Sequence, residues 1–138
     1  MMISTRGRYA LRMMLDLAKH QSDGYVPLKE IAEREGISKK YLEQIIPELN
    51  RAGLLRTSRG AGGGYRLIKA PEEYTVGEII RVTEGSMAPV SCLEGQENPC
   101  PRCSDCETLP IWQGLQKLVD AYLDGITLAD VIAGQVDA

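Results

Sequence analysis

Residues 28–67, LKEIAEREGISKKYLEQIIPELNRAGLLRTSRGAGGGYRL, decide the fold of this chain. Apolar side chains at helical spacing predict a short helix over residues 28–35 and a second helix that begins after Ser38. Gly36 lies between them, where a tight turn with a positive φ costs glycine little. Two helices joined by a short turn that contains glycine form a helix-turn-helix, so we expect that motif here.

The second half of this stretch predicts a β-hairpin. After Gly53 the helical period ends, and LLRTS (54–58) and YRLI (65–68) have the composition of two short strands. The glycine-rich segment RGAGGG (59–64) is expected to form the turn between them. A hairpin placed directly after a helix-turn-helix forms a wing, so the stretch predicts a winged helix-turn-helix.

The rest of the chain predicts further helices. Ser4 is suited to cap a first helix. Thr75 and Glu78 have the spacing of a capping box, and Thr127 and Asp130 have the same spacing near the C-terminus. Outside the motif, one helix is expected to begin near residue 4. Three others are expected at residues 75–85, about 109–123, and 127–134.

Charge divides the chain into two parts. Residues 1–70 carry 13 Lys/Arg and 7 Asp/Glu, a net of +6, whereas residues 71–138 carry 3 and 12, a net of −9. A basic part joined to an acidic part indicates a module that binds a polyanion, although ordinary surface charge is an alternative. We therefore predict a mainly α fold: a winged helix-turn-helix DNA-binding domain with a small β-hairpin wing at 1–70, then a connecting helix, a cysteine loop (92–106) and a long C-terminal helix at 71–138.

The sequence offers no membrane-spanning segment, since no apolar run approaches ~20 residues. The N-terminal apolar stripe is interrupted by Arg12, Asp16 and Lys19, so it does not have the pattern of a signal peptide. We therefore expect a cytoplasmic protein without a membrane partner. In a reducing cytosol, clustered cysteines more often form a metal site than a set of disulfides.

The second helix of the motif has the residues of a DNA reader on its polar face. N-terminal residues of a recognition helix reach base edges in the major groove. Glu43 can accept a hydrogen bond from the cytosine amino group, Gln44 can pair with adenine, and lysines suit phosphates. A solvated helix face is the alternative interpretation. The expected contacts on this helix are Ser38, Lys39, Lys40, Tyr41, Glu43 and Gln44.

The wing tip adds Arg59 and Gly60 to the expected DNA contacts. An arginine on a glycine-rich turn can approach a duplex closely and enter a narrow minor groove. The glycines also resemble a phosphate-binding loop, but neither Gly-Lys-Ser nor Gly-Lys-Thr follows them. His20, the single histidine, has no catalytic partner in the sequence. We therefore expect a DNA-binding protein that is not an enzyme and takes no small-molecule substrate.

All four cysteines lie in CLEGQENPCPRCSDC (92–106), with the spacing C-x7-C-x2-C-x2-C. Thiolates at this density suit zinc, a 2Fe–2S cluster or a 4Fe–4S cluster. Structural zinc favours two separated C-x2-C pairs, whereas a C-x2-C-x2-C run is typical of loops that give three ligands to an iron–sulfur cluster. An iron–sulfur cluster is the favoured interpretation, and zinc or redox-active thiols without metal are the alternatives. The candidate ligands are Cys92, Cys100, Cys103 and Cys106.

Four stretches of the chain resemble the winged-helix regulators of the IscR type, which are iron–sulfur cluster regulators: MMISTRGRYALRMMLDLA (1–18), residues 28–67, TVGEIIRVTEG (75–85) and ITLADVI (126–132). The resemblance covers essentially the whole chain, and YLEQ followed by RGAGGGY at this distance is its specific signature. It implies a homodimer that binds a palindromic operator, with the helix at about 109–123 as the dimerisation helix. It also implies that Glu43 and Arg59 contact DNA.

The cysteine loop departs from the pattern of that family, C-x5-C-x5-C-x2-H, which binds a 2Fe–2S cluster. Cys100 and Cys106 reproduce the second C-x5-C interval, and Cys92 matches the first cysteine if two residues are inserted. The histidine position falls on Leu109, which cannot ligate, and Cys103 is additional. By resemblance we expect a 2Fe–2S cluster, held by the four cysteines or by three cysteines and a non-cysteine ligand.

The expected function is a sequence-specific DNA-binding transcription regulator that senses an iron–sulfur cluster and controls cluster-assembly genes. The family also holds nitric-oxide sensors and cysteine-metabolism repressors, which remain alternatives of the same fold. A zinc or redox-thiol protein that uses its winged helix for protein contacts is a further alternative.

Overall fold

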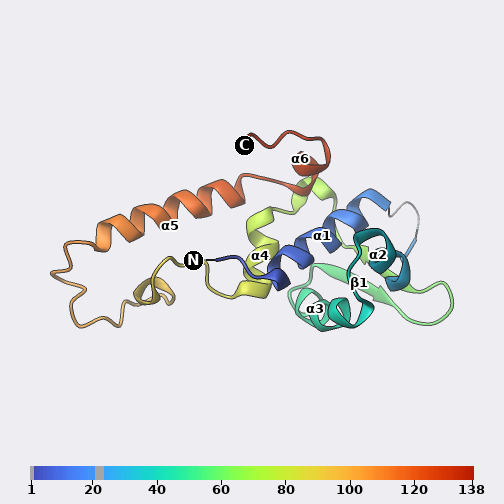
Figure 1. The fold of residues 1–138 in the computed structure, drawn as a ribbon, viewed down its shortest axis with the longest axis horizontal. Coiled ribbons are helices and arrows are strands. Elements are labelled where there is room, and N and C mark those ends of the chain that lie inside the picture. The colour runs from blue at the N-terminus through green and yellow to red at the C-terminus, as the bar shows by residue number, and fades with distance from the viewer. Residues whose placement is uncertain (1, 21–23) are drawn as a thin grey trace.

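The structure is a computed structural model that describes residues 2–20 and 24–138. The described part is mainly helical with one two-stranded sheet, which confirms the predicted fold class. In Figure 1 the first three helices and the hairpin form one body, and α5 extends away from it. The elements in order are α1 (Thr5–His20), α2 (Leu28–Glu35), α3 (Lys39–Arg51), β1 (Leu55–Ser58), β2 (Gly64–Leu67), η1 (Pro71–Glu73), α4 (Val76–Glu84), η2 (Ser91–Leu93), α5 (Leu109–Asp124) and α6 (Leu128–Ile132).

The helix-turn-helix forms as its turn and cap residues predict. Gly36 adopts a left-handed conformation with φ of 65° and ends α2. The Ser38 hydroxyl accepts a 3.1 Å hydrogen bond from the Tyr41 backbone N–H and so caps α3. Such a cap satisfies one of the backbone donors that a helix N-terminus leaves unpaired. Gly36 and Ser38 therefore set where α3 begins.

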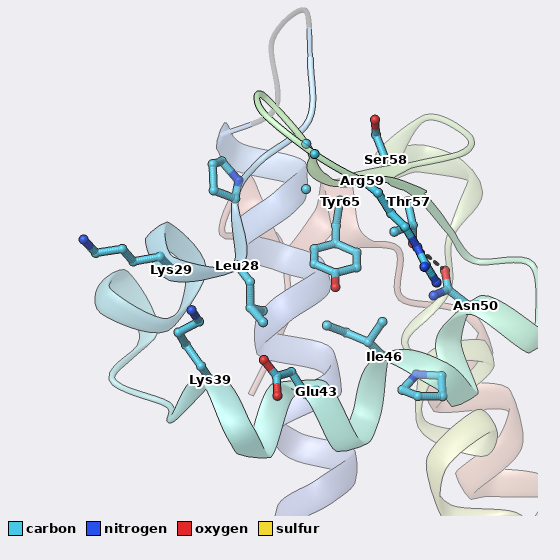
Figure 2. Close-up of a pocket in the computed structure, with 15 residues that line it drawn as sticks. Leu28, Lys29, Lys39, Glu43, Ile46, Asn50, Thr57, Ser58, Arg59 and Tyr65 are labelled. Atoms are coloured by element: carbon cyan, nitrogen blue, oxygen red, sulfur yellow. Dashed lines mark hydrogen bonds between the residues drawn. The ribbon is translucent and has the colours of Figure 1, made fainter.

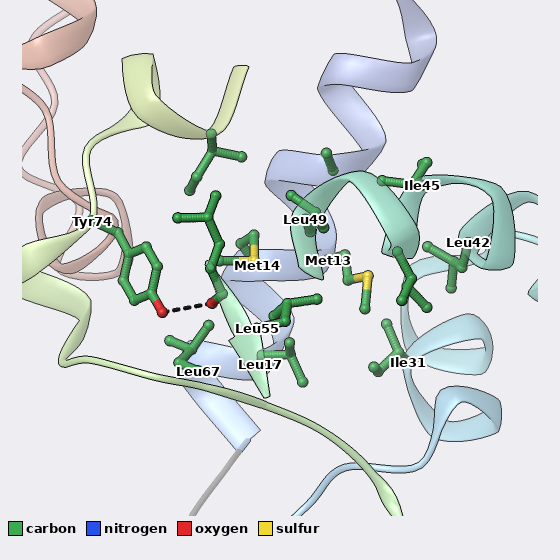
Figure 3. Close-up of a cluster of buried hydrophobic side chains, with 14 of the residues drawn as sticks. Met13, Met14, Leu17, Ile31, Leu42, Ile45, Leu49, Leu55, Leu67 and Tyr74 are labelled. Carbon is green, nitrogen blue, oxygen red and sulfur yellow. Dashed lines mark hydrogen bonds between the residues drawn. The ribbon is translucent and has the colours of Figure 1, made fainter. Parts of the chain in front are cut away.

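An aliphatic core joins these helices to the hairpin and to later parts of the chain (Figure 3). Tyr74 is fully buried and donates a 2.7 Å hydrogen bond to the Leu54 carbonyl, while its oxygen accepts from Ile68 N–H. Tyr74 lies beyond residue 70 and still packs in the core of the winged helix. The predicted division at residue 70 stays a prediction. The helical side chains of the core include Met13, Met14, Leu17, Ile31, Leu42, Ile45, Leu49, Ile79 and Leu128.

The wing is an antiparallel hairpin to which the segment before α2 adds a short third pairing. Val26 and Tyr65 exchange backbone hydrogen bonds of 2.8 and 2.9 Å. A Cβ on Gly64 would collide with the Val26 carbonyl, so this close approach requires glycine. Because Gly64 pairs with Ser58 of β1, the second strand begins one residue earlier than predicted, and Ile68 lies outside it and is 46% exposed.

A buried ion pair joins α1 to α2. Asp16 is fully buried, and both of its carboxylate oxygens accept hydrogen bonds of 2.9 Å from the Arg34 guanidinium. His20 Nδ1 lies 3.4 Å from Asp16 Oδ1 on the same helix. The bidentate geometry compensates the burial of this carboxylate, which would otherwise be strongly unfavourable.

Charged side chains also position α5 against α4. Arg81 of α4 donates to Asp124 at 2.6 Å and to Asp120 at 2.9 Å, one helical turn apart on α5. The predicted cap at Thr75 is half formed: its hydroxyl accepts from Glu78 N–H at 3.1 Å, but the Glu78 carboxylate pairs with Lys69 at 3.2 Å. The predicted capping box at Thr127 is fully formed.

The long helix α5 carries an apolar face that the chain leaves uncovered. Its side chains lie three or four residues apart and therefore on one side of the helix. In the described ranges, 2–20 and 24–138, no helix is long and apolar enough to cross a bilayer. The exposed residues are Ile111 (59%), Leu115 (37%), Leu118 (72%) and Tyr122 (55%).

Candidate nucleic-acid interface and cysteine loop

A groove of about 610 Å³ lies between the recognition helix α3 and the wing (Figure 2). Lys39 and Glu43 line it from α3, and Arg59 and Gly60 line it from the wing. Residues separated by more than a dozen positions in the sequence thus meet across one groove. Half of the predicted DNA contacts are brought together here.

The floor of this groove is Tyr65, which the sequence analysis did not select. Figure 2 shows its ring between the wing and α3, with the hydroxyl directed toward the helix. Burial raises the pKa of the Tyr65 phenol, the negative charge of Glu43 raises it further, and Arg59 opposes both effects. The groove therefore holds an acid on the helix and a base on the wing, with a neutral hydroxyl between them.

A hydrogen bond ties the recognition helix to the wing. The Thr57 hydroxyl of β1 lies 3.1 Å from the Asn50 side-chain oxygen on α3. Both residues line the groove, as does Lys29 of α2, and the sequence analysis missed all three. Thr57 lies opposite Tyr65 in the hairpin, so the two side chains share one face of it. The alternation of side chains along a strand could therefore have indicated that Thr57 belongs to the groove.

The other predicted contacts lie outside the lining of this groove. The Ser38 hydroxyl is engaged as a helix cap, whereas Lys40 and Gln44 are exposed. Tyr41 packs edge-on against Tyr9, with ring centroids 5.1 Å apart. Because its ring is half-buried against α1, Tyr41 has a packing role that the sequence analysis did not predict.

The cysteine loop lies between α4 and α5, far from the groove in Figure 1. Cys103 is exposed and Cys92, Cys100 and Cys106 are half-buried, and all four are free thiols. Its backbone folds through tight turns, one of which is closed by a 3.1 Å hydrogen bond from Cys103 N–H to the Cys100 carbonyl. The loop therefore presents its sulfurs near solvent and outside the core.

The surroundings of Cys106 perturb its thiol. Its sulfur lies 3.5 Å from the Thr108 hydroxyl, and this hydrogen bond lowers the pKa of the thiol. The nearby positive charge of Arg102 acts in the same direction. A thiolate is the form that binds metals, so the surroundings of Cys106 favour ligation.

The donor set of the loop fits an iron–sulfur cluster in number and chemistry. Four thiolates meet the requirement of two ligands for each iron of a 2Fe–2S centre. Throughout the described residues, however, no three His, Cys, Asp or Glu side chains are grouped as a metal ion would need. Ligation by this set would require the loop to draw its cysteines together.

Comparison with known proteins agrees with the winged-helix fold. A family model described as "Rrf2: Iron-dependent Transcriptional regulator" matches residues 3–134. The HTH-type transcriptional regulator IscR of Aliivibrio salmonicida is 42% identical over 132 residues, which cover 96% of this chain and 77% of that protein.

Solved structures of two related proteins have the same fold. CymR (YrzC), the global cysteine regulator of B. subtilis, superposes with a TM-score of 0.77 at 41% identity, covering 96% of this chain and 97% of that one. T. potens IscR superposes with a TM-score of 0.76 at 41% identity, covering 97% and 88%. The resemblance to IscR-type regulators is thus confirmed. The chain belongs to the Rrf2 family of iron-dependent transcriptional regulators.

Proposed function

We propose that this protein is a sequence-specific DNA-binding regulator whose DNA binding responds to an iron–sulfur cluster in the cysteine loop. The observation that carries the DNA part is the placement of Glu43 and Arg59 on opposite sides of one groove. A groove built only for nonspecific DNA would gain nothing from an acid, because Glu43 repels phosphates. An acid that accepts a hydrogen bond from cytosine explains its presence.

In this proposal α3 enters the major groove and the wing tip enters the neighbouring minor groove. Lys39 and Lys29 flank the groove between α3 and the wing and would contact phosphates, which fix the register of a protein on DNA. Glu43 would read bases, and Arg59 would read the width and potential of the minor groove. The hydrogen bond from Thr57 to Asn50 would keep these two readers at a fixed spacing.

The active form is proposed to be a homodimer on a palindromic operator. The exposed apolar face of α5 supports this, since a second copy would bury Leu118 and Tyr122 together with their apolar neighbours. A two-fold axis through such helices would present two copies of α3 to two half-sites. Loss of the dimer would therefore weaken binding to a palindrome far more than binding to one half-site.

Cys92, Cys100, Cys103 and Cys106 would hold the cluster, proposed as 2Fe–2S from the similarity to proteins named IscR. When bound, the cluster would cross-link the four cysteines, and this link would be sensitive to iron supply and to oxidants. Half-exposed thiols on a surface loop suit such a sensor, because they can be reached by oxidants. The same similarity supports cluster-assembly genes as targets.

The loop would act through the helix that follows it. Drawing the four cysteines together would shift the start of α5, while Arg81 holds the far end of this helix to α4 through Asp120 and Asp124. The two copies of α3 would then change their relative placement. A ligand can bias two such states only by its difference in affinity for them.

The DNA part is tested by binding of the anaerobically purified full chain to duplexes selected from a random library. Replacing Glu43→Ala should raise affinity for scrambled duplexes and reduce discrimination by about 1–3 kcal/mol. Glu33→Ala, which removes an exposed acid of α2, is the matched control and should change neither quantity. Wild-type protein with no preference among duplexes would sink the proposal.

A second candidate keeps the DNA reader and replaces the cluster by the thiols themselves. It is favoured by the four free, ungrouped cysteines and by the structural likeness to a cysteine regulator. Iron and sulfide assays on anaerobic protein separate the two candidates. Iron and acid-labile sulfide at about two per chain support the cluster, whereas neither element with intact DNA binding supports the thiol regulator.

A further inference from the structure

The outer face of the wing carries two arginines directly opposite each other. The register of the hairpin pairs Arg56 of β1 with Arg66 of β2. Their neighbours Leu55 and Leu67 are buried, so alternation along each strand directs both arginines to the other face of the hairpin. The Cβ atoms of residues paired in this way lie about 4.5–5.5 Å apart, and like charges on directly opposite residues destabilise a sheet.

Neither arginine is neutralised within the described chain. No ion pair forms at Arg56 or Arg66 in that part of the protein. The Arg66 guanidinium lies over the Tyr25 ring at 5.7 Å, and its buried Nε has no hydrogen-bond partner among the residues that the structure describes. By contrast, Arg12 and Arg34 of the same basic half each have a carboxylate partner. Two arginines in facing positions, with no carboxylate partner among the described residues, indicate a site for an anion.

The position of this pair relative to DNA follows from the proposed function, on which the inference rests. Arg59 at the wing tip is three residues from Arg56, about 10 Å along an extended strand. The inner face of the hairpin is the one turned toward α3, with Thr57 and Tyr65. With α3 in the major groove and the tip in the adjacent minor groove, this face lies over the DNA strand between the two grooves. Its outer face then lies toward the other strand that borders the minor groove.

We infer that Arg56 and Arg66 together bind phosphates of that outer strand, beyond the segment that α3 reads. The planar guanidinium group matches phosphate oxygens with two parallel hydrogen bonds. A phosphate between the two arginines also removes their mutual repulsion. DNA is favoured over an acidic protein surface because Arg56 belongs to the strand that leads directly into the DNA-facing tip. Phosphate contacts add affinity without sequence preference.

The test compares the double variant Arg56→Gln/Arg66→Gln with the wild-type full chain. The affinity of each protein is measured for three duplexes over a range of salt concentrations: one selected by the wild-type protein, a scrambled one, and the selected duplex trimmed at both flanks. The control is Lys19→Gln/Lys117→Gln, which removes the same charge from exposed positions on α1 and α5. Thermal unfolding of each protein is followed by circular dichroism.

The inference predicts a loss of about 0.9 in the slope of log affinity against log salt for each phosphate contact removed. Selected and scrambled duplexes should weaken alike, roughly tenfold or more at about 0.1 M salt, and trimming the flanks should cost the double variant less than the wild type. The unfolding midpoint should stay the same or rise, because like-charge repulsion is removed. The control should keep the wild-type slope.

Three results would overturn it. An unchanged slope and affinity in the double variant would show that the pair touches no phosphate. Weakening confined to the selected duplex would assign the arginines to bases, and a loss of self-association would assign them to the acidic half of a second copy. If the wild-type protein binds no duplex at all, the proposed function fails as well, and that result is recognisable because the control and the variant are then equally inactive.

Discussion

Asn50 on the recognition helix and Thr57 on the wing are joined by a 3.1 Å hydrogen bond across the groove that is proposed to hold DNA. Both side chains are exposed, so Thr57→Val should change the free energy of unfolding by about 1 kcal/mol or less. It should still weaken binding to a selected duplex, because α3 and the wing lose their fixed spacing. A double-mutant cycle with Asn50→Ala, read by fluorescence anisotropy, measures the coupling. Additive effects of the two substitutions would show that the hydrogen bond sets no spacing.

The buried pair of Asp16 and Arg34 predicts an unequal stability response among arginines. Arg34→Ala leaves a carboxylate with no exposed surface and should lower the free energy of unfolding by about 3–5 kcal/mol. Arg51→Ala removes an exposed arginine from the end of α3 and should change it by about 0.5 kcal/mol or less. Urea denaturation measures both. Equal losses would mean that Asp16 does not depend on its partner.

Gly64 predicts a strict requirement for glycine in the wing. Its φ is 153°, and an added Cβ would meet the carbonyl of Val26, which is backbone and cannot rotate away. Gly64→Ala should destabilise the protein by about 1–3 kcal/mol and speed hydrogen exchange of the Val26 and Tyr65 amides. Gly95→Ala is the control: an added Cβ there would lie at an ordinary contact distance of 3.7 Å from the Glu97 carbonyl, so both measurements should stay unchanged. Slow exchange in Gly64→Ala would contradict this role.

The apolar face of α5 predicts dimer loss on a single charge insertion. Leu118 is 72% exposed, and Leu118→Lys should yield a monomer by sedimentation velocity, since a partner would have to bury the new charge. Gln113→Lys places the same charge at an exposed position away from that face and should leave the dimer intact. A dimeric Leu118→Lys protein would place the interface elsewhere.

Local signals in the sequence were enough for the helices and the wing. Gly36 and Ser38 fix the turn and the start of α3 through their own backbone and hydroxyl chemistry, which needs no knowledge of the rest of the fold. The groove itself was predicted only in part. Glu43 and Arg59 carry charge and were therefore predicted as DNA contacts, whereas Tyr65 resembles an ordinary strand residue until the hairpin is placed against α3.

Long-range partners were beyond the reach of periodicity. The third pairing joins Val26 to Tyr65 of the second strand, and nothing in the strand's own composition reveals that partner. Glu78 was predicted to return to Thr75, but Lys69 lies within 3.2 Å and takes the carboxylate instead. Such choices depend on which side chains tertiary packing brings near, so they follow from the structure rather than from local spacing.

In the proposed mechanism the cysteine loop controls sequence-specific DNA binding. The most direct test titrates a selected duplex with one anaerobic preparation of the full chain, before and after removal of iron by a chelator, with iron and sulfide measured in each sample. Cys103→Ala, with Ser104→Ala as control, is titrated alongside. We predict iron and sulfide in the wild-type and control proteins, little in Cys103→Ala, and a change in duplex preference that follows the iron content. Identical DNA binding in all samples, whatever their iron content, would contradict the account.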